Sequence, residues 1–420
     1  MMTIWVVLGL SGIIVCANGD LRDAIWVASV NSVLLGVYVF WSHGGRQITV
    51  AGVYSIGPAI FVGFAGIYLL IQPDDPTVNF ALFKAISLAY FAHLASYGLF
   101  WLNPIVQHVP RSPGSGSAAS WGIKWGMILL VAGSAAASSG ILSASIGQAA
   151  AFTGATLLTV SLTARSARPG KLSAWQALAI ILAFLVYVTF DFTGGGRLVV
   201  VGLGAALATV ASTQVRGHRM KLVMLLAVVP ALLIFGSIRY TSGIAAGDTA
   251  INYNGLGSVV SPLQTFSTLL TRNDEGNPLP RGHGGTFVAT AVSQVPRSLW
   301  PDKPAGFGAV LTEQLYPTLV GIHLSLAALS PGEWFYNFGY PGLVLMAVVV
   351  GFLIRRIDLW LITLMSLRLD RRRRLLALTI AGTLAGGILD LFWVGSFTFA
   401  ARTVPRLFFI AVLGLLARER

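Results

Sequence analysis

One long polar stretch of the sequence, residues 239–333, holds several basic side chains, and others lie at the ends of the apolar segments beside it. Arginine has a planar guanidinium group that binds phosphate oxygens through two parallel hydrogen bonds. Such a set predicts a site for an anionic ligand, although lipid headgroups or acidic residues of the same stretch are alternative partners. The basic residues in question are Arg197, Arg239, Arg272, Arg281, His283, Arg297, Lys303, His323, Arg402 and Arg406.

Arg197 follows three consecutive glycines at the predicted start of an apolar helix. Glycine lets the backbone approach a ligand closely, and the amides and dipole at a helix N-terminus favour a phosphate group. The alternative is a flexible turn with an arginine that extends to the membrane surface. Arg239 and Tyr240 end the following apolar segment on the same predicted side and join the candidate site.

Three residues of the polar stretch could accept a proton. His283 lies in Arg-Gly-His-Gly-Gly and His323 in Gly-Ile-His-Leu-Ser, and histidine titrates near neutral pH. A structural role is the alternative for each. Glu333 opens a predicted apolar helix, where the helix dipole favours a carboxylate in any case. Asp390 lies within an apolar segment, where functional and structural roles are equally expected.

Metal and cofactor motifs are missing from the sequence. It contains no phosphate-binding P-loop, no His-Glu-x-x-His, no Cys/His cluster and no Gly-x-Ser-x-Gly elbow. The adjacent carboxylates Asp74 and Asp75 are only weak evidence for a metal. The sequence therefore predicts no metal and no cofactor. The single cysteine, Cys16, excludes a disulfide framework.

Composition indicates which elements position these residues. The hydrophobic fraction is 55%, charged residues are 10% and the mean hydropathy is +0.77, whereas soluble domains carry roughly a quarter charged residues. We therefore predict an all-α polytopic membrane protein with about twelve transmembrane helices and one large external loop containing short helices. The predicted spans are 3–18, 25–42, 50–72, 80–102, 121–138, 148–164, 173–192, 198–215, 221–238, 334–353, 375–396 and 404–417. The first segment lacks a signal-peptide pattern and is expected to be retained.

The distribution of lysine and arginine predicts the orientation. A cytoplasmic N-terminus places most basic residues in cytoplasmic loops, including the run at 371–374. Residues 1–238 then form a nine-helix bundle, 239–333 the external loop, and 334–420 the last helices, with a basic cytoplasmic segment at 355–374 and a cytoplasmic C-terminus. The net charge of +13 reflects this topology and contact with anionic lipid, which argues against nucleic acid.

Two apolar stretches do not fit the regular pattern of spans. Residues 359–367 are too short to cross a bilayer and are expected to lie along the cytoplasmic interface. Residues 308–329, within the external loop, are apolar enough to re-enter the membrane or to pack on its outer surface.

Three motifs of the polar stretch carry a resemblance to a known family. They are Gly-Gly-Thr at 284–286, Val-Pro-Arg-Ser-Leu-Trp-Pro-Asp-Lys-Pro at 295–304 and Ser-Pro-Gly-Glu-Trp-Phe-Tyr-Asn-Phe-Gly-Tyr-Pro-Gly at 330–342. Together they resemble the Wzy-type O-antigen and oligosaccharide repeat-unit polymerases. Gly-Gly-Arg197 is similar to the Gly/Ser-Arg element of that group and of the related O-antigen ligases.

The resemblance implies a reaction and a set of roles. A glycan on polyprenyl diphosphate is transferred whole to a sugar hydroxyl of another lipid-linked unit, without a metal, at the outer face of the cytoplasmic membrane. By the resemblance, Arg197 and Arg297 hold phosphate or sugar, and Arg239 and Arg272 assist them. Together with the residue types described above, the predicted catalytic residues are Arg197, Arg297, His323 and Glu333. The predicted substrate-binding residues are Arg239, Tyr240, Arg272, Arg281, His283, Trp300, Lys303 and Tyr336. The ligases place a catalytic histidine ahead of Gly-x-x-Gly, and His323 precedes Gly339-Tyr-Pro-Gly342 at a wider spacing.

The implied partners are the lipid-linked donor and acceptor, membrane lipids, a chain-length regulator and a flippase. Three alternative functions stay open. An O-antigen ligase uses the same donor and a different acceptor. A lipid-oligosaccharide flippase or another transporter would have charges along several spans and two similar halves. A lipid-phosphate-sugar glycosyltransferase would have an acidic first outer loop, which here offers only Asp20 and Asp23.

Overall fold

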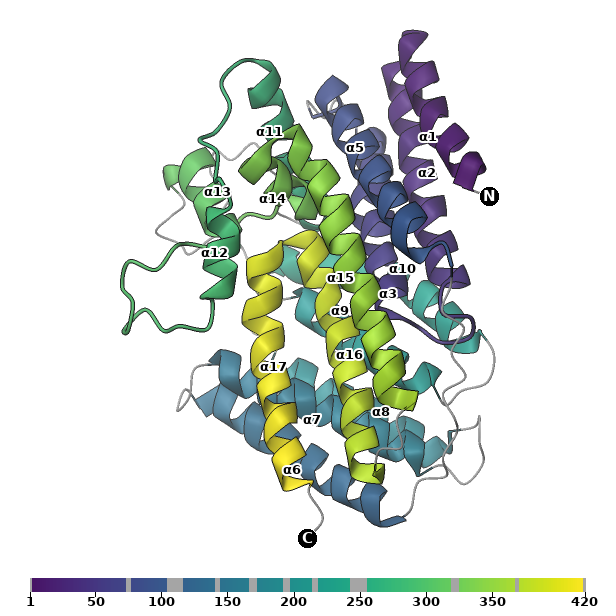
Figure 1. The fold of residues 1–420 in the computed structure, drawn as a ribbon, viewed down its shortest axis with the longest axis vertical. Coiled ribbons are helices and arrows are strands. Elements are labelled where there is room, and N and C mark those ends of the chain that lie inside the picture. Colours follow the sequence, from purple (N-terminus) through teal and green to yellow (C-terminus); the bar gives the residue numbers. More distant parts are fainter. Residues whose placement is uncertain are drawn as a thin grey trace.

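The computed structural model describes residues 2–72, 77–103, 116–139, 144–165, 172–191, 197–213, 218–241, 255–318, 325–366 and 370–417, and every regular element in these ranges is a helix (Figure 1). The prediction of an all-α fold is confirmed for this part of the chain. Each of the nine apolar segments predicted before residue 239 coincides with a helix. These are α1 (Met2–Ala17), α2 (Leu21–Ser42), α3 (Val50–Pro58) with α4 (Ala65–Ile71), α5 (Phe80–Ser96), α6 (Gly116–Ser139), α7 (Ala144–Ala164), α8 (Ala174–Asp191), α9 (Arg197–Ser212) and α10 (Arg219–Thr241).

Polar residues directly before the apolar segments determine where several helices begin. Thr49 and Asn79 accept hydrogen bonds through their side chains from the amides of Gly52 (3.1 Å) and Leu82 (3.0 Å), which caps α3 and α5. Asp370 caps α16 (Arg371–Trp393) in the same way. Such caps satisfy amide groups that have no partner inside the helix.

Two helices contain π-helical turns. The π-helix η1 (Ala59–Phe64) joins α3 to α4, and η2 (Tyr97–Trp101) extends α5. After η1, Gly66 approaches α2 so closely that a Cβ atom at this position would collide with the hydroxyl of Ser29. Helices α2 and α4 are therefore in close contact.

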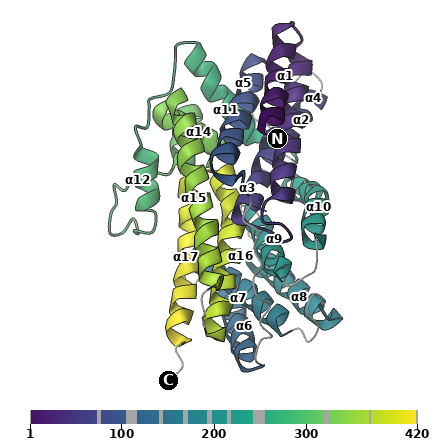
Figure 2. The same cartoon turned by 45° about the vertical axis from the view of Figure 1, so that its right-hand side comes forward.

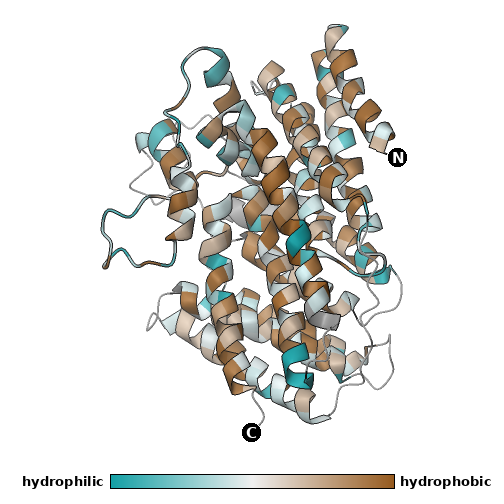
Figure 3. Ribbon diagram, in the orientation of Figure 1, coloured by the Kyte–Doolittle hydropathy of each residue, from teal (hydrophilic) through white to brown (hydrophobic). Residues whose placement is uncertain are grey.

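Seven helices in the described ranges are long and apolar enough to cross a membrane. They are Leu21–Ser42, Val50–Ile71, Phe80–Trp101, Ser145–Ala164, Ala174–Asp191, Arg371–Trp393 and Ser396–Leu416, and α1 and α9 are apolar but shorter. The coarse expectation of a helical membrane protein fits this finding. Hydrophobic residues cover much of α15 and the lower part of α17, whereas hydrophilic ones gather near α11 and α12 (Figure 3). Beyond these seven helices, the predicted total of about twelve crossings stays a prediction.

Helix α16 forms the centre of the bundle and packs against α3, α7, α9 and α17 (Ser396–Leu416). Its contact with α9 is between backbones, because an added Cβ atom on Gly202 or Gly386 would approach the carbonyl oxygen of the other glycine. The close approach of α9 to α16 brings the first turn of α9 near the core of the molecule.

The predicted external loop contains four helices, which we call the cap. They are α11 (Gly257–Asp274), α12 (Gly285–Ala291), α13 (Phe307–Leu315) and α14 (Leu329–Phe338), and they gather at one end of the molecule (Figures 1 and 2). Helix α11 packs against α5 and buries apolar side chains such as Leu263 and Phe266. The short helices expected in this stretch are therefore present, and α11 is longer than expected. Of the apolar stretch 308–329, residues 308–315 belong to α13 and residues 319–324 lie outside the described ranges.

The tenth predicted span, 334–353, has the wrong boundaries. Gly339, with φ at 67°, separates α14 from α15 (Tyr340–Ser366), so Glu333 and Trp334 belong to the cap helix α14. Helix α15 then continues without a break to Ser366, so residues 359–366 do not form a separate interfacial segment. Within this continuous helix the buried carboxylate of Asp358 accepts the first amides of α3, from Val50 (3.0 Å) and Ala51 (3.1 Å), and so joins α15 to α3.

Candidate functional site

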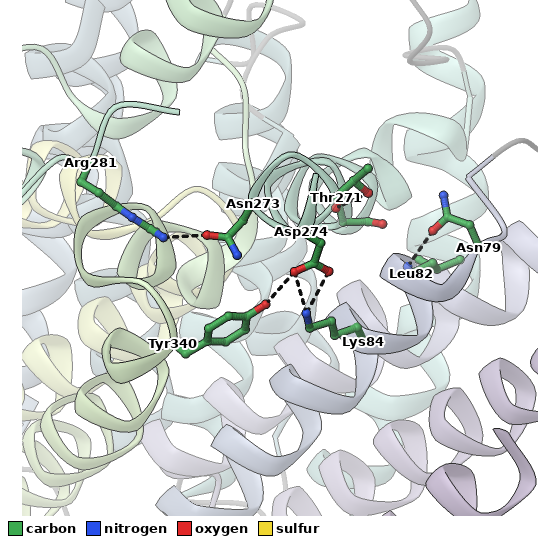
Figure 4. Close-up of polar contacts among 9 residues, drawn as sticks. Asn79, Leu82, Lys84, Thr271, Asn273, Asp274, Arg281 and Tyr340 are labelled. Atoms are coloured by element: carbon green, nitrogen blue, oxygen red, sulfur yellow. Dashed lines mark hydrogen bonds and ion pairs between the residues drawn. The ribbon is translucent and has the colours of Figure 1, made fainter. Parts of the chain in front are cut away.

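The cap is attached to the bundle by a cluster at the end of α11 (Figure 4). The Asp274 carboxylate accepts hydrogen bonds from Lys84 Nζ (2.9 Å) and from the Tyr340 hydroxyl (3.2 Å). Arg281 donates to Asn273 Oδ1 (2.8 Å) and to the carbonyl oxygen of Phe335 (2.7 Å). These contacts join α5, α11, α14 and α15, so they position the cap.

Three predicted substrate-binding residues have their polar atoms engaged within the cap. Arg281 forms the contacts just described. Lys303 Nζ donates to the carbonyl oxygens of Ser293 (3.1 Å) and Val295 (2.7 Å). The hydroxyl of the buried Tyr336 accepts a hydrogen bond from Gln314 (3.1 Å). In this conformation all three support the cap structure.

Four other predicted site residues lie at the surface of the cap or close beneath it. His283 is exposed and has φ at 44°, in the left-handed region that favours glycine. Arg297 and Trp300 are exposed in the connection between α12 and α13, and Arg297 donates to the carbonyl oxygen of Pro301 (3.0 Å). Arg272 is half-buried near Tyr316. These four residues remain accessible to a ligand.

Four predicted residues have side chains that lie outside the description. His323 falls in the range 319–324, which is not described. Arg197 is the first residue of α9, and Arg239 and Tyr240 lie in the last turn of α10, but nothing is described of their side chains. Their predicted roles stay predictions.

Glu333 is buried at the junction of α12, α14 and α17. Its carboxylate accepts the backbone amide of Ser396 (2.7 Å), the Ser396 hydroxyl (2.8 Å) and the Thr286 hydroxyl (3.0 Å). Asn337 donates to Thr286 Oγ1 (2.8 Å) and accepts from the amide of Gly284 (2.9 Å). Because Ser396 is the first residue of α17, Glu333 caps that helix, and its carboxylate is closed to a substrate in this conformation.

The Glu333 carboxyl makes the stability of this junction pH-dependent. Burial raises its pKa above the ordinary value of 4.5, against the hydrogen bonds from Ser396 and Thr286. The native state therefore binds the proton more tightly than the unfolded state. Its contribution to stability is complete below pH 4.5 and is lost as the pH rises through the raised pKa.

We expect Glu333→Gln to flatten the dependence of stability on pH, because glutamine does not titrate and keeps an acceptor for the Ser396 amide. The measurement is the midpoint of thermal unfolding in detergent at a series of pH values upward from 4.5. The wild-type midpoint minus that of the variant should fall as the pH rises. A constant difference would show that Glu333 does not titrate in this range.

A second group of charges, which we call the charged cluster, lies between α7, α8, α16 and α17. It consists of Asp191, Tyr187, Asp390, Arg402 and Arg406. Arg402 Nη1 forms an ion pair with Asp390 Oδ1 at 2.6 Å. The guanidinium of Arg406 stacks on the ring of Phe152, 3.7 Å from its centroid, and its buried Nη1 atom has no hydrogen-bond partner within the described part of the chain.

Asp191 and Tyr187 add further unsatisfied atoms to the charged cluster. Asp191 Oδ2 accepts a hydrogen bond from Ser134 (2.6 Å), whereas its Oδ1 atom and the Tyr187 hydroxyl are buried and have no partner among the residues that the structure describes. Tyr187 is within electrostatic range of both aspartates and both arginines. Unsatisfied buried polar atoms are unusual and often mark a site that a ligand or water completes.

The charged cluster is near predicted functional elements. Asp191 ends α8, and Arg197 begins α9 six residues later. Arg402 lies two turns into α17, whose first residue is held by Glu333 of the cap. The sequence indicated Arg402, Arg406 and Asp390 as candidates, but it did not single out Asp191 or Tyr187. The available signal for Asp191 was an acidic residue inside an apolar span, which is costly without a role.

The chemistry available in the charged cluster is anion binding and proton transfer. Two guanidinium groups can hold phosphate oxygens, and the Asp191 carboxylate can accept a proton, once a movement of the surrounding helices opens the buried Arg406 and Asp191 to a ligand. Among the described residues, no three His, Cys, Asp or Glu side chains are placed to hold a metal ion together.

Comparisons of the chain with models of known protein families, with curated proteins and with solved structures found no match. The arrangement of the charged cluster and the cap is therefore the basis for a functional argument.

Proposed function

We propose that this protein is a membrane glycosyltransferase that polymerises oligosaccharide repeat units carried on polyprenyl diphosphate. The observation that carries this proposal is the buried guanidinium of Arg406 beside Arg402, whose Nη1 atom has no hydrogen-bond partner among the described residues. Two buried or half-buried arginines share the single carboxylate of Asp390, which leaves positive charge to be compensated, and the diphosphate of a lipid-linked substrate supplies the missing anion. In the proposed orientation the cap lies outside the cytoplasmic membrane and contacts the first turn of α17, the helix that carries Arg402 and Arg406.

In the proposed reaction the acceptor hydroxyl oxygen attacks the anomeric carbon of the donor glycan. The bond between that carbon and the diphosphate oxygen breaks, and polyprenyl diphosphate leaves with the electron pair. Arg402 and Arg406 stabilise the charge that develops on the leaving group. Asp191 Oδ1 accepts the proton of the hydroxyl, while Ser134 holds the other carboxylate oxygen.

The test of the reaction is the glycan profile of a deletion strain. A polymerase is expected to leave glycans of a single repeat unit when it is deleted. Free polymer that reaches no acceptor would instead indicate a ligase, which shares the donor chemistry. Unchanged glycans would overturn both.

The position of Arg406 also favours a second candidate, a transporter of lipid-linked oligosaccharide. Arg406 is near the midpoint of α17, a helix long enough to span a membrane, and buried charge at that depth is common along transport pathways. Purified protein in vesicles distinguishes the two functions. Movement of the lipid without glycan transfer would replace the polymerase proposal.

We expect Asp191→Asn to reduce polymer formation by roughly 10²–10⁴-fold, the usual contribution of a general base. Binding of undecaprenyl diphosphate to the purified variant should equal that of the wild type, because asparagine retains the hydrogen bond from Ser134. Asp23→Asn, the same change at an exposed site in α2, is the matched control. Normal polymer from Asp191→Asn would remove Asp191 from the mechanism and leave the proposed function intact.

A further inference from the structure

The connection between α12 and α13, residues 292–306, carries exposed apolar side chains at its tip. Leu299 is 79% exposed and Trp300 is 41% exposed. In two views the connection projects sideways from the molecule, beside α12 (Figures 1 and 2). A leucine and a tryptophan side by side in such a position indicate a contact surface.

Internal hydrogen bonds hold this connection in a defined shape. Lys303 Nζ closes it by binding the carbonyl oxygens of Ser293 and Val295. The amides of Leu299 (3.0 Å) and Trp300 (3.1 Å) donate to the carbonyl oxygen of Pro296. The apolar tip is therefore presented by a preorganised loop, which reduces the entropy lost on binding.

The start of the connection is attached to a helix that can span the membrane. Gln294 Nε2 donates to the carbonyl oxygen of Ala400 (3.1 Å), which lies near the beginning of α17. Ala400 also begins a row of residues spaced by four along α17. Its next members, Val404, Phe408 and Val412, have exposed apolar side chains, as lipid contact requires.

The connection thus lies at the upper end of the lipid-facing row of α17. We infer that residues 292–306 form a membrane-interface anchor, in which Leu299 and Trp300 insert at the boundary between lipid headgroups and acyl chains. Tryptophan prefers this boundary because its ring is apolar and its N–H is polar. The exposed Arg297 lies at headgroup level and contacts lipid phosphate.

This inference assigns Arg297 and Trp300 to the bilayer surface, in place of the substrate contacts predicted from the sequence. It also explains the engagement of Lys303 within the loop. The anchor fixes the height of the cap above the membrane. This role is the same whichever reaction the charged cluster performs.

The experiment measures the depth of a fluorophore at residue 299. In a Cys16→Ser background, which removes the single cysteine of the chain, Leu299→Cys is labelled with an NBD fluorophore. The labelled protein is reconstituted into phosphatidylcholine–phosphatidylglycerol vesicles that contain lipids brominated either near the headgroup or deep in the chain. Asn277→Cys, an exposed position between α11 and α12 that follows the polar sequence Asp-Glu-Gly, is the matched control.

We expect the label at 299 to shift its emission to shorter wavelength in vesicles and to be quenched most by the shallow bromines. The label at 277 should keep the emission of a water-exposed fluorophore and remain unquenched. Identical behaviour at the two sites would overturn the anchor. A shift of the emission at residue 299 that grows with protein concentration, without quenching by brominated lipid, would also overturn the anchor. That result would identify a second protein copy as the partner. Leu299 is exposed, so its replacement leaves the fold intact.

Discussion

Replacing Arg406 with methionine is expected to abolish polymer formation and, at the same time, to raise the temperature at which the protein unfolds. The guanidinium of Arg406 is buried, and its Nη1 atom lacks a partner. A methionine of similar length fills the same space without a charge. Removing a charge that is not fully compensated relieves a desolvation penalty of several kcal/mol. The loss of the cation–π contact with Phe152 costs about 2 kcal/mol in the opposite direction.

The net gain in stability is therefore about 1–3 kcal/mol, the range of a buried unsatisfied group. Asp390 keeps its ion pair with Arg402 in this variant, so no new unpaired charge appears. Thermal unfolding in detergent measures the stability, and the glycan profile of the producing strain measures the function. Arg406→Lys is the control for charge, because it retains the cation without the planar fork. A variant Arg406→Met that still makes polymer would exclude Arg406 from diphosphate binding.

The second large effect is expected from Arg402→Ala, which should destabilise the protein by about 3–5 kcal/mol. The Asp390 side chain is 2% exposed and the Arg402 side chain is 30% exposed. Removing Arg402 leaves the buried Asp390 carboxylate without its ion-pair partner. Removing Asp390 instead leaves an arginine that can extend its charged end to the surface, at a smaller cost.

The double variant Asp390→Ala with Arg402→Ala should therefore be more stable than Arg402→Ala alone. Lys84→Ala is the control, because it breaks the more exposed pair with Asp274 and should cost at most about 1 kcal/mol. The measurement is the thermal unfolding midpoint of Arg402→Ala, Asp390→Ala, the double variant and Lys84→Ala, all in one detergent. If Arg402→Ala and Lys84→Ala cost the same, burial does not determine the strength of the pair between Arg402 and Asp390.

The helices before residue 239 could be predicted from the sequence because their signal is local. Each is a long apolar run, and residues such as Thr49 and Asn79 mark the starts of several. The length and position of helix α11 were not predicted, because serine and threonine interrupt its apolar positions. Its spacing from Val260 through Leu263 to Leu270 is helical, but this signal is weak beside that of an uninterrupted apolar run.

The charged cluster could not be assembled from the sequence, because its members come from three separate segments. Asp191 ends α8, Asp390 lies near the end of α16, and Arg406 lies in α17. Their proximity depends on tertiary packing, including the backbone contact between Gly202 and Gly386. Glu333 illustrates the same point, since the sequence indicated a carboxylate at the start of its own helix, whereas the structure places it at the start of α17.

The π-helical winding of η1 determines how α4 is rotated about its axis. This winding accommodates about one residue more than α-helical winding over the same rise. If the same residues of η1 wound as a regular α-helix, α4 would be rotated by roughly 100° about its axis. Gly66 would then turn away from Ser29, and a larger residue would occupy a space too small for a single Cβ atom. Relatives of this protein should therefore conserve the π-helical turn together with the glycine at position 66.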